Sequence, residues 1–293
     1  MTGTVSSEAR GGGATLPGVA GMDIGRNGNG TVTVRNGARI EVKADIKGDG
    51  SPAISLGRDA ASSGRLTITG AGSTVLISAQ SVLPGGGPGE AFNPFMRVGR
   101  DGIGELTITQ GGKLLMDGQA VATVTDQRYT TLFIGGTGST TPGGKGFATV
   151  SGAGSEIRLT GVDTNIAVGF GPQASGNLTI ADQGKVSAIG LSVGAAGGTG
   201  VLKMDNSLMQ LSGQETGGTL TGAYLTLGNG GGIAVASMAN GSVININNTG
   251  SEGAGVYLGG GAVRPGGDGS LTMSGGSQIN IQAAPGLGVL RVG

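Results

Sequence analysis

Short runs of alternating apolar and polar residues recur along most of this chain, and glycine lies at the ends of nearly every run. One kind of run closes with an aliphatic residue and a glycine, at Ile24-Gly25, Leu56-Gly57, Val98-Gly99, Ile134-Gly135, Val168-Gly169, Val193-Gly194, Leu227-Gly228, Leu258-Gly259 and Val292-Gly293. The glycines of successive pairs are 32, 42, 36, 34, 25, 34, 31 and 34 residues apart. A spacing of roughly 20 to 50 residues is typical of solenoids, propellers and other repeat arrays.

Each repeat unit is predicted to hold three short strands. The first ends at the aliphatic-glycine pair, as in 22–24 and 95–98. The second follows another glycine and reads VTV, LTI or LTM, which is the alternation of a half-buried strand. The third follows a turn rich in Gly and Asn, which tolerate positive φ, and has inward pairs such as Ile40 and Val42. The glycines predicted to open the second strand are Gly30, Gly64, Gly104, Gly146, Gly176, Gly200, Gly232 and Gly269.

Three strands per unit are one short of the four antiparallel strands in a propeller blade of ~40 to 50 residues. If each unit makes one turn of a coil, equivalent strands lie in register about 4.8 Å apart and form three parallel sheets around an aliphatic core. We therefore predict an all-β fold: a right-handed, three-sided parallel β-helix of about eight full coils plus the first strand of a ninth. This β-solenoid is expected to be a single domain over residues 21–293 and a rod of roughly 40 Å.

The two ends of the chain depart from the repeat. The first twenty residues match no unit and are predicted to form a leader or cap, either folded or disordered. The last five residues, 289–293, read as the opening strand of a further coil. Because a solenoid needs a cap to prevent end-to-end pairing, this end either was excerpted from a longer repeat protein or stacks on another chain. We favour the excerpt.

Composition excludes several other kinds of structure and partner. Glycine accounts for 67 of 293 residues, more than three times the ordinary share of roughly 7%. Glycine does not recur at every third residue, which excludes collagen, and the regular aliphatic runs exclude simple disorder. With 18 basic and 18 acidic residues, no field should attract nucleic acid, and no stretch is apolar enough for membrane insertion.

Outward columns of side chains follow from the predicted stacking. Thr33, Thr67, Thr107, Thr149, Thr179 and Thr272 are expected to share one face, interrupted by Lys203 and Val235. We interpret this column as ordinary solvent-facing strand threonine rather than an ice-binding plane, which would want two matched columns. The outward column of the third strand is predicted to be Glu41, Leu76, Leu115, Arg158, Ser187, Gln210, Asn245 and Asn280, without a carboxylate pair.

Catalytic and metal chemistry have little support in the sequence. The chain contains no His and no Cys, so nucleophilic and zinc chemistry are not expected. We predict a protein that is not an enzyme and has no cofactor. A calcium-binding nonapeptide array is also not expected, because the partial match at 266–269 does not recur. The weak candidates for an isolated metal ion are Asp49, Asp101 and Asp268.

Arginine recurs in the turn after the first strand of three consecutive units, at Arg26, Arg58 and Arg100. Asn27, Asp59 and Asp101 follow them directly. Stacking would place the like charges one rung apart with carboxylates beside them. We interpret this as a solvated charge network rather than an anion site, because surface ion pairs contribute little.

The connection after the third strand varies most in length, and repeat proteins usually place recognition in such insertions. Its longest forms are 79–94 and 118–131. A second class of loop carries Pro-Gly-Gly-x-Gly at 142–146 and 265–269. Tolerated insertions without a ligand are the alternative. The ligand-binding candidates are Pro84, Glu90, Phe92, Asn93, Asp126, Arg128 and Tyr129.

The units VGRDGIGELTITQGGKLLM, LGRDAASSGRLTITGAGSTVLI and VGFGPQASGNLTIADQGKV resemble the repeats of bacterial autotransporter passengers and of related large exported proteins. The resemblance implies an extracellular or cell-surface, glycine-rich stalk with a structural or adhesin role, although no signal segment is visible. Its expected partners are surface polysaccharide or further copies of itself. Two alternatives stay open: a self-assembling filament, layer or phage-fibre subunit on a virion, and a β-helix that binds or degrades polysaccharide.

Overall fold

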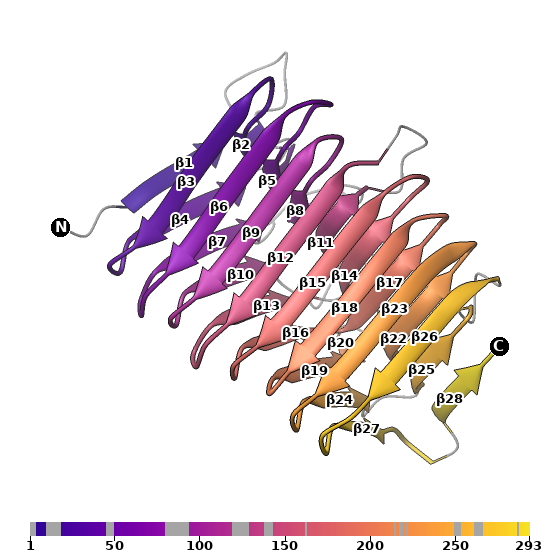
Figure 1. Cartoon of the computed structure of the whole chain (residues 1–293). Coiled ribbons are helices and arrows are strands. Elements are labelled where there is room, and N and C mark those ends of the chain that lie inside the picture. The colour runs from indigo at the N-terminus through magenta and orange to yellow at the C-terminus, as the bar shows by residue number, and fades with distance from the viewer. Residues whose placement is uncertain are drawn as a thin grey trace.

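The computed structural model describes residues 4–9, 19–44, 50–79, 94–118, 129–137, 143–161, 163–213, 215–216, 219–220, 222–248, 253–260, 266–285 and 287–293. Within these residues there is no helix, and the strands form three parallel sheets and one antiparallel pair. The sheets run side by side along the molecule, so that equivalent strands of successive units stack in a row (Figure 1). The predicted three-sided parallel β-helix is confirmed.

Each sheet collects one strand from every unit. Sheet A contains β1 (Thr4–Ala9), β4 (Arg39–Ala44), β7 (Thr74–Ala79), β10 (Lys113–Asp117), β13 (Glu156–Thr160), β16 (Lys185–Ala188), β19 (Leu208–Gly213), β24 (Val243–Asn248) and β27 (Gln278–Gln282). Sheet B contains β2 (Val19–Ile24), β5 (Gly50–Leu56), β8 (Phe95–Val98), β11 (Tyr129–Gly136), β14 (Asp163–Phe170), β17 (Gly190–Ala195), β22 (Ala223–Asn229), β25 (Ala254–Leu258) and β28 (Gly288–Val292). Sheet C contains β3 (Asn29–Arg35), β6 (Ser63–Thr69), β9 (Ile103–Thr109), β12 (Lys145–Ser151), β15 (Ser175–Ala181), β18 (Thr199–Asp205), β23 (Gly232–Ala239) and β26 (Gly267–Met273).

The chain visits the sheets in the order B, C, A and then repeats. In the described residues this makes eight complete coils, from β2–β4 to β25–β27, and β28 opens a ninth, as predicted. The coil is right-handed: the front strands in Figure 1 point to the lower left, the chain turns behind them, and it advances from left to right. Strand β1, which the repeat pattern did not predict, pairs in parallel with β4, and β20 (Glu215–Thr216) pairs antiparallel with β21 (Thr219–Leu220).

The core follows from the period-2 alternation. In β6 the side chains of Leu66 and Ile68 are fully buried, while Arg65, which precedes Leu66 in the same strand, points outward and is exposed. Equivalent residues are paired from rung to rung, so Leu66 lies beside Leu106 and Ile68 beside Ile108. One aliphatic cluster results from the inward side chains of all three sheets and extends from Ile24 to Val256. Burial of this apolar surface is the main stabilising contribution, at roughly 25 cal/mol per Å².

The structure explains why glycine recurs at the end of the first strand of each unit. All nine glycines of this column have positive φ, between 60° and 94°. A Cβ at Gly99 would overlap the carbonyl oxygen of Lys145 in the next coil. Two constraints therefore select glycine here, the left-handed backbone and the close approach of a neighbouring strand.

The second glycine was predicted correctly in seven units and wrongly in one. Gly30, Gly64, Gly104, Gly146, Gly176, Gly200 and Gly269 all fall in one column of sheet C. In β23, however, Ala234 rather than Gly232 pairs with Gly200 and Gly269. Three consecutive glycines at 230–232 obscured the register, and burial of Ala236 and Met238 decides it. The threonine column is consequently interrupted by Lys203 and Ser237, not by Val235.

Candidate functional site

The corner between sheets A and B is the variable corner of this solenoid. After β10 and β19 the chain takes long connections, 118–128 and 214–222, before it returns to sheet B. After β13 and β16 the connection shrinks to residues 161–162 and then to residue 189. Gly161 and Ile189 of these short connections both line a cleft in the outer surface of the rod.

A cleft of about 340 Å³ lies at this corner where it is shortest. It is lined by Asp117, Arg158, Leu159, Thr160, Gly161, Thr164, Ser187, Ala188, Ile189, Gln210 and Ser212. These residues come from the third strands of four consecutive coils, from the two short connections between them and, at Thr164, from β14 of sheet B. The cleft therefore runs across several rungs of the solenoid.

The polar lining of the cleft is partly organised by hydrogen bonds. The Thr160 hydroxyl donates to Asp117 Oδ1 at 3.0 Å. Gln210 Nε2 donates to Ser212 Oγ at 3.0 Å, and Gln210 Oε1 accepts from Asn245 Nδ2 at 3.3 Å. Asn245 in turn accepts from Asn280 Nδ2 at 2.9 Å, so an amide ladder leads along sheet A into the cleft. These bonds orient the amide of Gln210.

Arg158 supplies the positive charge of the cleft. Its side chain is exposed on the outward face of β13, and its lateral neighbours are Leu115 and Ser187. It forms no ion pair with any other residue that the structure describes. Buried Leu159, Ala188 and Ile189 contribute apolar surface to the same lining. A ligand rich in hydroxyl groups and bearing at most one anionic group matches this lining.

The predicted outward column of sheet A is confirmed by the strand register. Glu41 pairs laterally with Ser6 and Leu76, and the column continues through Leu115, Arg158, Ser187, Gln210, Asn245 and Asn280. No two carboxylates are adjacent along it. A general acid and a general base from this column would need two such groups on neighbouring rungs.

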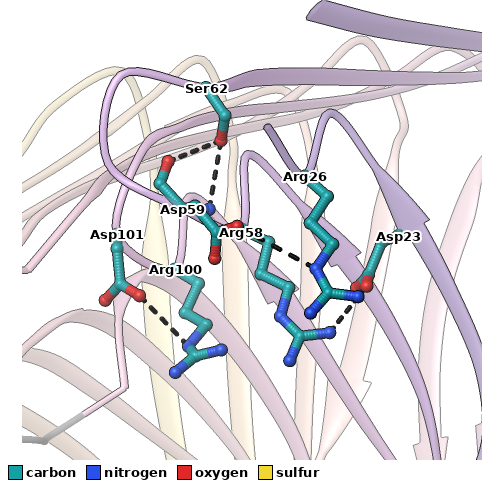
Figure 2. A network of polar contacts seen from close by, with 7 residues as sticks. All are labelled: Asp23, Arg26, Arg58, Asp59, Ser62, Arg100 and Asp101. Carbon is teal, nitrogen blue, oxygen red and sulfur yellow. Dashed lines mark hydrogen bonds and ion pairs between the residues drawn. The ribbon is translucent and has the colours of Figure 1, made fainter. Parts of the chain in front are cut away.

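The ion pairs of the predicted charge network are present at the corner between sheets B and C, and two of the three cross from rung to rung (Figure 2). Arg58 Nη1 lies 2.6 Å from Asp23 Oδ2 of the preceding coil. Arg26 Nε lies 3.9 Å from Asp59 Oδ2 of the following coil, and Arg100 Nε lies 3.3 Å from Asp101 Oδ2 in its own turn. The guanidinium groups point in the same general direction in Figure 2.

The sequence-predicted binding residues Pro84, Glu90, Phe92, Asn93, Asp126 and Arg128 lie outside the described residues, as does Asp49. Tyr129 begins β11, where its backbone pairs with Asp163. Asp101 and Asp268 lie five coils apart, in the third and eighth coils, so the structure does not bring them together. In the described part of the chain there is no group of three or more acidic side chains placed to hold a metal ion.

Sequence reasoning missed the concentration of aromatic residues on sheet B. Of eight aromatics, six lie in its strands: Phe95, Tyr129, Phe133, Phe170, Tyr224 and Tyr257. The rings of Phe133 and Phe170 are 6.0 Å apart. The available signal was a recurrence before the glycine of the aliphatic-glycine pair, two residues before it at Phe133 and Tyr257 and four residues before it at Phe95 and Tyr224.

Asp163 and Tyr224 are two of the sheet B residues whose pKa values are shifted. Burial raises the pKa of the Asp163 carboxyl. Burial, and then the negative charge of Asp163, raises the pKa of Tyr224 to about 12. The Tyr224 ring occupies the space that a side chain at Gly190 would take, which brings it back toward the preceding coils. A phenol of this kind is a hydrogen-bond donor that stays neutral at ordinary pH.

The described residues include no helix that is long and apolar enough to cross a membrane. Comparisons of this chain with protein-family models, with curated proteins and with solved structures find no match.

Proposed function

We propose that this protein is a non-catalytic structural or adhesive stalk of a bacterial surface or exported protein. The observation that carries the proposal is the continuity of the rod: each of the three sheets runs in parallel from the first coil to the eighth without a break in its strand order. The resemblance of the repeat units to autotransporter passengers supports the same role.

The packing is suited to a rigid spacer between two parts of a larger protein. Every inner strand is hydrogen-bonded to the equivalent strand above and below, and the aliphatic cluster extends through all eight coils. Solenoids of this type are stabilised by contacts between neighbouring units, so length can be added without a larger globular core. A continuous rod with the same three-sheet core in every coil results.

Surface labelling tests the stalk role. Antibodies raised against the purified rod should label intact, unpermeabilised cells of the bacterium that encodes it, and fractionation should recover the protein with the cell envelope or the medium. Recovery from the cytoplasm alone would contradict the proposal. A screen against acidic and neutral polysaccharides tests the non-catalytic part, because any turnover would refute it.

Binding of surface polysaccharide at the variable corner is a second candidate, favoured by the cleft around Arg158 and Gln210. A saccharide offers many hydroxyl groups, which the Gln, Ser and Thr side chains of the lining can pair with. Glycan-array binding followed by calorimetry would measure it. Replacing Gln210 with Ala should weaken binding at least fivefold, whereas Lys203→Ala, an exposed change on sheet C, should leave it unchanged. Equal binding by both variants would exclude the cleft.

A further inference from the structure

Arg97 stands apart from the other charged residues at the corner between sheets B and C. It lies on the outward face of β8, and its guanidinium carbon is 4.2 Å from the centroid of the Phe95 ring. Its Nε atom is buried and has no hydrogen-bond partner. A buried N–H without a partner costs free energy, and no acceptor among the described residues offsets the charge of this guanidinium at its Nε atom.

The neighbouring carboxylates are already engaged. Asp23 pairs with Arg58, Asp59 with Arg26, and Asp101 with Arg100. Four guanidinium groups therefore meet three carboxylates among the described residues of this corner, and Arg97 is the one for which no ion pair forms. We call Arg58, Arg97 and Arg100 the arginine corner.

The electrostatics agree with an excess of positive charge at this point. Burial lowers the pKa of Arg97, and the charges of Arg100 and Arg58 lower it further, against the opposing effect of Asp101 and Asp23. The residue remains charged at ordinary pH because guanidinium begins from so high a value. An anion between these groups would relieve the repulsion among them.

We propose that the arginine corner is a binding site for one oxyanion of an acidic saccharide, held by the guanidinium of Arg97 with the ring of Phe95 beside it. A guanidinium presents two parallel N–H groups that match the oxygens of a carboxylate or a sulfate ester. Phe95 is half-buried, and its ring packs against the guanidinium of Arg97 and holds it in place on the outward face of β8. The site is separate from the cleft of the variable corner and does not depend on the stalk role.

Calorimetry on the full chain with three oligosaccharides of equal length tests the site. An oligogalacturonate supplies carboxylates, a sulfated oligosaccharide supplies sulfate esters, and a neutral oligosaccharide supplies neither. We expect at least one anionic ligand to bind and the neutral ligand not to bind; the anionic ligand that binds identifies the source of the oxyanion. Absence of binding by both anionic ligands, or equal binding of the neutral one, would overturn the proposal.

Substitutions locate the binding. Arg97→Gln should weaken the anionic ligand at least tenfold, and Arg97→Lys should fall between this variant and the native chain, because it keeps the charge and loses the paired donors. The matched control is Arg65→Gln, which removes the same charge from sheet C, where Arg65 pairs with Glu105 at 2.6 Å. An equal loss in Arg97→Gln and Arg65→Gln, or equal affinity for duplex DNA, would show attraction by overall charge only and would refute the site.

A ligand-free measurement separates binding from folding. Arg97→Gln removes only the contact of the guanidinium with the Phe95 ring and no ion pair with a described residue, so it should keep the melting temperature within about 3 °C of the native value or raise it. Arg58→Gln should lower the melting temperature more, because the substitution leaves Asp23 without its ion-pair partner. A large fall in Arg97→Gln would mean that its charge serves the fold, and the proposal would be wrong.

Discussion

At the scale of the single residue, the glycines of the first column carry the geometry of the corner between sheets B and C. Their positive φ turns the chain out of sheet B, and their missing side chains let the next coil approach. The two effects are normally confounded when a glycine is replaced. The two constraints can be separated by comparing Gly169, which has both, with Gly241 in the turn between β23 and β24, which has only the positive φ.

Gly169→Ala should therefore destabilise the fold much more than Gly241→Ala. A Cβ at Gly169 would overlap the carbonyl oxygen of Thr199, whereas a Cβ at Gly241 meets nothing within 4 Å, although its φ is +75°. The strain of a left-handed alanine costs about 1 to 2 kcal/mol, which is all that Gly241→Ala should lose. Urea unfolding of both variants measures the difference; equal losses would show that the rung spacing adjusts freely.

Tyr224 gives a second prediction at this scale. Its pKa, raised to about 12 in the fold, exceeds the ordinary value of 10.0. The fold therefore favours the neutral phenol, so this contribution to stability is complete below about pH 10 and is lost as the pH rises from 10 to 12. Spectrophotometric titration should show a late phenolate step that Tyr224→Phe removes. Asp163→Asn should move that step to lower pH, because it removes one of the two causes; an unchanged step would contradict the assignment.

At the scale of the element, the turns between sheets C and A are joined from coil to coil by buried serines. Ser155 is fully buried; its hydroxyl accepts from the Gly111 N–H at 3.0 Å and donates to the Ser151 carbonyl at 2.8 Å. Ser73 binds the Gly37 N–H in the same way at 3.1 Å. Each such hydroxyl links the turn of one coil to the turn of the previous one.

Ser155→Ala should cost about 1 to 3 kcal/mol, because it leaves the Gly111 N–H without its acceptor. Ser277 is the matched control, since it holds the equivalent turn position, is only half-buried, and donates within its own turn to the Ser274 carbonyl at 2.7 Å. Its replacement by alanine should cost a few tenths of a kcal/mol. Chemical denaturation of both variants provides the test, and comparable losses would mean that the link between coils is not what the serine supplies.

At the scale of the whole molecule, the features that could be predicted from the sequence are those that recur in every coil. Inward pairs such as Val75 and Ile77 follow from a period of two, and the coil number follows from the glycine pairs. The strand β1 was missed because TVSSEA lacks the glycine corners and paired aliphatics of the repeat.

Features that arise from short or absent segments leave no motif. The cleft lies where the connections after β13 and β16 are short, and a short connection offers few residues from which a site could be predicted. The lack of an ion pair at Arg97 could not be predicted from the sequence either. It depends on which carboxylates the neighbouring arginines contact in the adjacent coils. Register could be predicted; the partners of long side chains could not.

The solenoid architecture also predicts how damage spreads through the rod. Leu178 is fully buried in β15, near the middle, and its column neighbours are Ala148 and Leu202. Leu178→Ala should cost about 2 to 5 kcal/mol, as truncation of a core leucine normally does. Because each coil contacts mainly its neighbours, the loss should remain local: hydrogen exchange should accelerate in β12, β15 and β18 and stay unchanged in β6. Uniform acceleration along all three sheets would show instead that the eight coils unfold as one cooperative unit, so that the rod would unfold along its whole length rather than first at its least stable coil.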